Sequence, residues 1–210
     1  MRSLIAVASV LAIVSVATAD IMAVDLGLGA NPLPSSFPLG PYTVVELPDD
    51  VSPTGYTPVS TAPGVPPLSG DLIFGAEVQH VQVGADWSTW ASDRTPDAYY
   101  NPTTELRILL PALTGAFALW VEPNPFEVFD ITVSGIDQDG EWTSLTLPVS
   151  GLSGANGYGF YATAGQVITA VDINGGTVDF AVGEFYGAQV PEPTSLGLLA
   201  LGALALLRRR

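Results

Sequence analysis

The chain contains no cysteine and no lysine, and its only histidine is His80. Without cysteine it has no disulfide framework, no thiolate nucleophile and no cysteine metal ligand. A single histidine excludes a two-histidine metal site, and His80 lies in an alternating run that predicts a strand residue rather than a catalytic base. The fold must therefore be held together by its own packed core.

Basic side chains are scarce, and most of them lie near the chain ends. The six arginines are Arg2, Arg94, Arg107 and Arg208 to Arg210. A product running from about residue 20 to 191 keeps two arginines and 20 of the 21 carboxylates, a net charge of −18. Because nucleic acids and anionic lipids are bound mainly through lysine and arginine, we predict no nucleic-acid partner and no membrane contact outside the tail. Such a body would either attract divalent cations or simply stay soluble.

The composition indicates a β protein. Apolar residues make up 48% of the chain, charged residues only 13%, and there are 22 glycines and 18 prolines. Short runs rich in β-branched and aromatic residues, bounded by turn residues, predict strands at 72–83, 105–110, 117–122, 127–133, 141–147, 158–162, 167–173 and 178–186. Asp-Gly in 137–140 and Asn-Gly-Gly in 174–176 are typical of hairpin turns. We predict an all-β fold, an antiparallel jelly-roll-like β-sandwich over residues 70–188.

The amino-terminal residues 1–19 have the pattern of a signal peptide. Arg2 supplies a positive start, residues 4–16 are apolar, and Ala17 and Ala19 form a small-x-small cleavage site. We predict a signal helix that signal peptidase removes, which leaves a mature chain starting near Asp20.

Residues 20–69 are rich in proline, with ten prolines between 31 and 69. Proline fixes φ and removes a hydrogen-bond donor, so we predict an extended, irregular segment. It would be either a stalk or a segment laid over the sheet, with 44–47 as a short edge strand. Its apolar residues, which include Phe37 and Tyr42, favour partial packing.

The tail at 189–210 resembles the PEP-CTERM sorting signal of bacterial exported proteins. Its three parts occur in order: Val190-Pro191-Glu192-Pro193-Thr194, a hydrophobic helix over 196–207, and Arg208-Arg209-Arg210. Twelve helical residues span only ~18 Å of the ~30 Å hydrocarbon core, and the arginines stay cytoplasmic. The resemblance implies an exosortase that cuts near the Pro-Glu-Pro sequence, whereas the alternative is a permanent single-span anchor. Residues 106–188 are similar to the β-sandwich body of many such proteins, which implies a fold and no activity.

Aromatic residues among polar ones mark a candidate sugar platform. Trp87, Trp90, Tyr99 and Tyr100 lie in one predicted loop that also holds carboxylates. Exposed aromatic faces stack on sugar rings while acids accept hydroxyl hydrogen bonds. The alternative is that Trp87 and Trp90 plug the end of the sandwich. Trp120 and Trp142 are predicted core or cross-strand residues.

Two acidic groups are candidate calcium sites, since calcium binds several oxygens. The first is Asp130, Asp137, Asp139 and Glu141, where turn formation alone would explain the Asp-Gly pair. The second is Asp86, Asp93 and Asp97. Glu122 and Glu127 could form a glycosidase pair, but paired carboxylates are common in so acidic a chain, and we predict no catalytic residue.

Together these features predict an exported, exosortase-processed structural protein of the cell surface or extracellular matrix. Its precursor would be membrane-anchored. The alternative is a module that binds carbohydrate, such as exopolysaccharide, with calcium as the only cofactor considered. We expect no enzyme activity.

Overall fold

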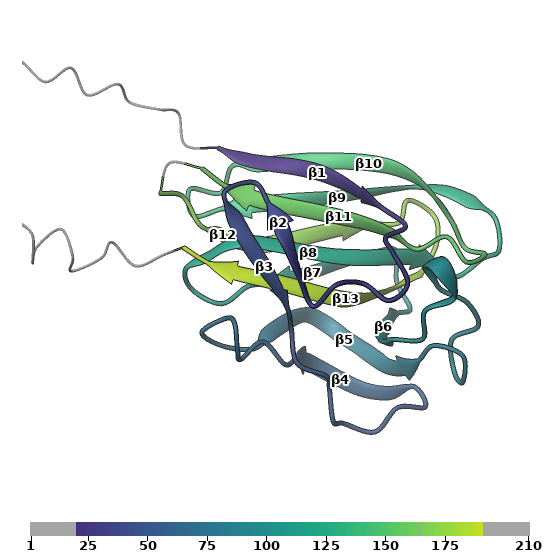
Figure 1. Ribbon diagram of the computed structural model, residues 1–210. Coiled ribbons are helices and arrows are strands. Elements are labelled where there is room, and N and C mark those ends of the chain that lie inside the picture. The colour runs from purple at the N-terminus through teal and green to yellow at the C-terminus, as the bar shows by residue number, and fades with distance from the viewer. Residues whose placement is uncertain (1–19, 164, 191–210) are drawn as a thin grey trace, which may run out of the picture.

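The computed structural model describes residues 20–163 and 165–190. The predicted signal helix at 1–19 and the hydrophobic helix of the tail lie outside the described residues. Within the described part, β1 (Ile21–Gly27) begins and β13 (Phe180–Gln189) ends at the same side of the molecule, on the left of Figure 1. The two segments with predicted processing signals therefore join the body at one end.

The strands form an antiparallel sandwich, as predicted. Besides β1 and β13, the strands are β2 (Ser36–Leu39), β3 (Tyr42–Glu46), β4 (Thr57–Ala62), β5 (Leu72–Gln82), β6 (Asp97–Asn101), β7 (Glu105–Leu109), β8 (Thr114–Pro123), β9 (Val128–Asp137), β10 (Trp142–Ser150), β11 (Asn156–Ala162) and β12 (Ile168–Asn174). The sheet order is β1-β11-β8-β13-β6-β5-β7-β12-β9-β10, and its two halves face each other across a core. Thr143 Oγ1 on β10 donates a hydrogen bond to the Ile21 carbonyl on β1 (2.8 Å), so the sheet nearly closes.

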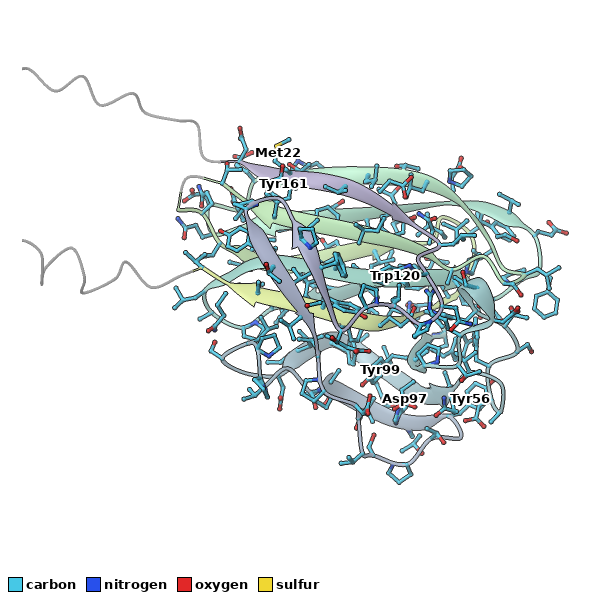
Figure 2. All side chains as sticks on the ribbon, in the orientation of Figure 1. Met22, Tyr56, Asp97, Tyr99, Trp120 and Tyr161 are labelled. Carbon is cyan, nitrogen blue, oxygen red and sulfur yellow. The ribbon has the colours of Figure 1, made fainter. Side chains whose placement is uncertain are left out.

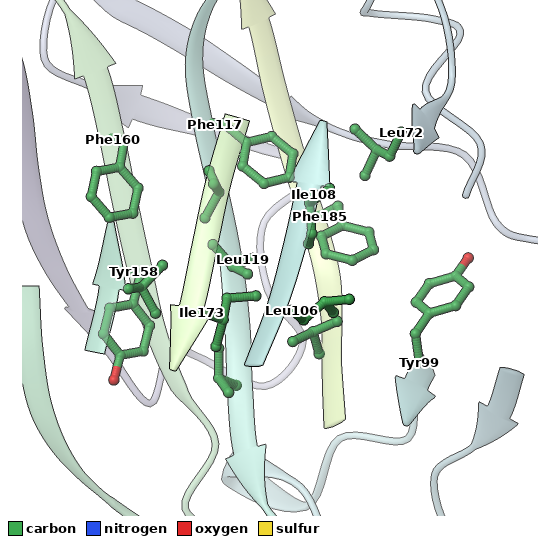
Figure 3. Close-up of a cluster of buried hydrophobic side chains, with 14 of the residues drawn as sticks. Leu72, Tyr99, Leu106, Ile108, Phe117, Leu119, Tyr158, Phe160, Ile173 and Phe185 are labelled. Carbon is green, nitrogen blue, oxygen red and sulfur yellow. The ribbon is translucent and has the colours of Figure 1, made fainter. Parts of the chain in front are cut away.

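The main core lies between the two halves of the sheet. Figure 3 shows Phe117 and Leu119 of β8 among buried side chains of the opposite half, such as Ile108 and Ile173. Tyr158 of β11 crosses this layer and donates its hydroxyl to a β9 carbonyl at 3.0 Å. Alternation along each strand supplies these apolar side chains, because every second residue points to the same face.

A second layer of packing covers the outer face of β8. All ten residues of this strand are buried, including Ala116, Ala118 and Trp120, which point away from the main core. The β2–β3 hairpin and the 87–94 segment cover this face, on which Trp120 is labelled in Figure 2. Small residues allow the β2–β3 hairpin to approach the sheet closely. On β11, next to β8, a Cβ at Gly159 would come within 2.9 Å of the Leu39 side chain of β2.

Residues 20–69 belong to the sandwich and do not form a separate irregular segment. They contribute four strands, of which β1 pairs with β11, β3 with β13 and β4 with β5. The short strand predicted at 44–47 is present as β3, but it pairs with both β2 and β13 and is therefore not an edge strand. Prolines are compatible with these strands because Pro38 and Pro58 lie on β2 and β4, which each pair on one side only.

Candidate functional site

The predicted aromatic loop does not form an exposed platform. Trp87, Trp90 and Tyr99 are 6%, 1% and 4% exposed, and Tyr100 is half-buried. Trp87 Nε1 donates to Glu122 Oε2 and Trp90 Nε1 to Glu184 Oε2, both at 2.7 Å. The indoles are therefore turned inward to two buried carboxylates, which accounts for the tryptophans in this loop without a ligand.

Glu122 and Glu127 lie in different surroundings. Glu122 is fully buried and also accepts hydrogen bonds from Thr89 Oγ1 (3.3 Å) and the Gly154 amide (3.2 Å). Burial raises the pKa of the Glu122 carboxyl above its ordinary value, against the lowering effect of these donors. Glu127 is exposed. Glu122 thus fastens the loop to the sheet.

Glu184 holds a buried ion pair. Arg94 Nε lies 2.6 Å from Glu184 Oε1, and both side chains are almost completely buried. Arg94 Nη1 also donates to the carbonyls of Leu28 (2.7 Å) and Ala30 (3.0 Å). Glu184 has a φ of 51° at a bulge in β13, a conformation that non-glycine residues rarely adopt. The pair ties the chain after β1 to the sheet.

The structure does not bring together the four residues of the first calcium candidate, Asp130, Asp137, Asp139 and Glu141. Asp137 Oδ1 accepts the amides of Asp139 (2.8 Å) and Glu141 (2.9 Å), so this carboxylate shapes the turn. Asp130 lies seven residues earlier along β9, too far away to share their site. Across residues 20–163 and 165–190, no three His, Cys, Asp or Glu side chains are grouped so that they could hold a metal ion.

Residues of the second acidic group, Asp86, Asp93 and Asp97, also make contacts within the fold. Asp86 Oδ2 accepts the amides of Gly55 (2.9 Å) and Gln82 (3.1 Å). Asp97 lies 3.8 Å from Nε2 of the buried His80, and burial is the main cause that raises the Asp97 pKa. Asp93 is exposed in a short 3-10 turn. These three residues are thus spread over separate contacts.

A groove of about 660 Å³ lies on the outer face of the β5-β7-β12-β9-β10 half. This volume lies within the range of ligand sites. None of the residues predicted to form a site lines it. The lining side chains come from five neighbouring strands; they include Glu105, Arg107, Thr132, Ser134, Trp142, Ser144, Asp172 and Asn174.

Polar side chains form two rows across the strands in this groove. One row pairs Ser144 with Ser134, then Asp172 with Arg107. The serine hydroxyls are 2.7 Å apart, and Arg107 binds Asp172 through two hydrogen bonds of 2.6 Å. The hydrogen bonds and charge of Asp172 raise the Arg107 pKa. Because guanidinium has five N–H donors, three remain beyond this bidentate pair.

The second polar row and an apolar row flank the first. In the second row, Thr132 and Thr146 hydroxyls lie 2.8 Å apart, and Asn174 Nδ2 donates to Glu105 (3.4 Å). The apolar row consists of five residues that are paired across successive strands: Trp142, Ile136, Ala170, Leu109 and Ile73. Trp142 is 72% exposed, the most exposed aromatic ring among the described residues. The groove therefore combines an open indole with ordered hydroxyl, amide and charged groups.

The carboxyl end of the body leads directly into the tail. Val190 still donates its amide to the Leu113 carbonyl (2.8 Å), and Pro191 follows. Residues 189–210 match the family model of the PEP-CTERM protein-sorting motif. The chain carries a PEP-CTERM sorting motif. Searches of curated proteins and of solved structures found no match.

The PEP-CTERM motif marks this chain as an exosortase substrate, exported with a membrane-anchored precursor that is processed for the cell surface. Apart from Gln189 and Val190, its residues lie outside the described part, including Pro191, Glu192, Pro193, Thr194 and Arg208 to Arg210. Among the residues that are described, no helix is long and apolar enough to cross a membrane.

Proposed function

We propose that the body of this exported surface protein holds a neutral polysaccharide chain in the groove of the β5-β7-β12-β9-β10 half. The observation that carries the proposal is Trp142, which is 72% exposed beside two polar rows. A pyranose ring presents an apolar C–H face, which stacks on an indole, and a rim of hydroxyls, which need donors and acceptors. No catalytic step is part of this proposal.

The charge of the protein favours a neutral glycan. The chain has a net charge of −15, and Glu105 and Asp172 line the groove. Anionic polymers such as alginate would be repelled, and the one arginine in the groove is already paired with Asp172. Neutral hydroxyls, in contrast, match the mixed donors and acceptors of Arg107, Asp172 and Asn174.

The dimensions favour a chain that runs across the strands. Each polar row crosses four neighbouring strands, which are ~4.8 Å apart, so one row spans ~14 Å. That length accommodates several sugar rings. Together with the sorting motif, this supports a surface or matrix protein that retains extracellular polysaccharide after signal peptidase and exosortase have acted.

A glycan array followed by calorimetry with cellohexaose, laminarihexaose and alginate tests the proposal. We expect binding to neutral linear glycans and none to alginate. Absence of binding to every neutral glycan on the array would contradict the proposal and leave a structural matrix role, the other function that the sequence predicts.

A further inference from the structure

A second, smaller pocket of about 240 Å³ lies at the start of β1. It is lined by Asp20 and by the carboxylate residues Asp137, Asp139 and Glu141 of the β9–β10 turn. None of its lining residues is basic in the part of the chain that the structure describes. Four acidic side chains thus surround a cavity with no positive group to balance them.

A buried acceptor in the same pocket lacks a donor. Gln166 is 8% exposed, and its Nε2 donates to Asp139 Oδ2 at 2.9 Å. A carboxylate accepts only, so this bond fixes the orientation of the amide. The other amide atom, Oε1, is then buried with no hydrogen-bond partner within residues 20–163 and 165–190. Such an acceptor requires an N–H or O–H donor.

The body contains few positively charged side chains that could balance these carboxylates. It has no lysine, and its arginines, Arg94 and Arg107, are each already paired with a carboxylate. Processing could add one further cation, an α-ammonium group at a new amino terminus. The predicted cleavage after Ala19 would create it on Asp20, which lines this pocket.

We propose that the α-ammonium group of Asp20, released by signal-peptide cleavage, binds in this pocket and locks β1 onto the sandwich. Water hydrolyses the Ala19–Asp20 peptide bond, Ala19 keeps the new carboxylate, and the Asp20 amine takes up a proton. The Asp20 nitrogen already donates to Thr163 Oγ1 at 3.0 Å. An ammonium has three N–H donors where the amide of the precursor has one, so two more become available for the carboxylates and Gln166 Oε1.

The chain itself allows a selective test, since it has no lysine and its α-amine is the only primary amine. The test uses the chain from Asp20 to Arg210, released from a fusion protein so that Asp20 is its amino-terminal residue, and kept in mild detergent. This chain is compared with its N-acetylated form. The pocket should raise the α-amine pKa by about one unit from ~7.7. At pH 6.5 the acetylated chain should then melt about 3 °C lower. A raised pKa stabilises the folded state below pH ~7.7, so the difference should disappear by pH ~10.5.

The rate of acetylation provides a second readout. At pH 7 the wild-type amine should react about 8-fold more slowly than that of Asp139→Asn/Glu141→Gln, because less of it is unprotonated. The double variant Glu127→Gln/Asp130→Asn removes the same charge from outside the pocket and should keep the slow rate. Equal melting of free and acetylated chains at pH 6.5 would overturn the proposal. If, in addition, Ca²⁺ raised the melting temperature and the Asp139→Asn/Glu141→Gln variant lost that rise, the pocket would be a calcium site.

Discussion

Replacement of Trp142 by alanine should weaken glycan binding without harm to the fold. The side chain is 72% exposed, which corresponds to ~180 Å² of a ~250 Å² tryptophan. A sugar ring that covers one face removes ~80 Å² from water. At ~25 cal/mol per Å² this contributes about 2 kcal/mol, or a loss of about 25-fold in Kd when the indole is removed.

Isothermal titration of wild type and Trp142→Ala with the tightest neutral oligosaccharide from the array measures this change. Phe126→Ala is the matched control: Phe126 is also an exposed aromatic residue, at 61%, and it does not line the groove. We expect the control to bind like wild type and both variants to unfold like wild type. A Kd for Trp142→Ala within about 2-fold of wild type would refute the stacking argument.

Three further predictions concern the buried carboxylates. Trp87→Phe removes the N–H donor to Glu122 and should lower the free energy of unfolding, measured in urea, by about 1–3 kcal/mol. Glycan affinity should stay unchanged. A large loss of affinity would indicate that the glycan binds at the aromatic loop instead. Arg94→Met leaves Glu184 buried without its cation and should cost about 3–5 kcal/mol, and a change below 1 kcal/mol would show that the pair is not buried in solution. Because burial raises the folded-state pKa of Glu122, its contribution to stability is larger at low pH and is lost as pH rises through that pKa. The stability of wild type relative to Glu122→Gln should therefore increase between pH 7 and pH 5, as urea unfolding at both pH values would show; a constant difference would contradict the burial of this carboxylate.

Much of the fold was predictable from local patterns. Eight predicted strands correspond to β5 and β7 to β13, because alternation and turn residues such as Asp137-Gln138-Asp139-Gly140 act over short distances. The strands β1, β2, β4 and β6 were missed. The edge strands β2 and β4 contain prolines, which are not typical of strands in a sequence. Residues Asp97 to Asn101 were predicted as part of a loop, and they form β6 only through pairing with β5 and β13.

The candidate site depends on long-range register, which no local pattern contains. Trp142 was predicted as a core or cross-strand residue; it does pair across strands with Ile136, but its ring is open to solvent. The alternating serines and threonines of β9 and β10 were the available signal, since they indicate one solvated sheet face. That Arg107 and Asp172 complete the same row follows only from the pairing of β7 with β12.

The four indole N–H resonances of the protein give the most direct test of the binding groove. Trp87, Trp90 and Trp120 donate to Glu122, Glu184 and the Gly27 carbonyl, respectively. Trp142 alone is exposed among the four. In ¹H–¹⁵N spectra recorded during titration with a neutral oligosaccharide, only the Trp142 indole signal should shift. A shift of the Trp87 or Trp90 signal instead, or a titration to saturation that leaves Trp142 unmoved, would contradict a binding site in this groove.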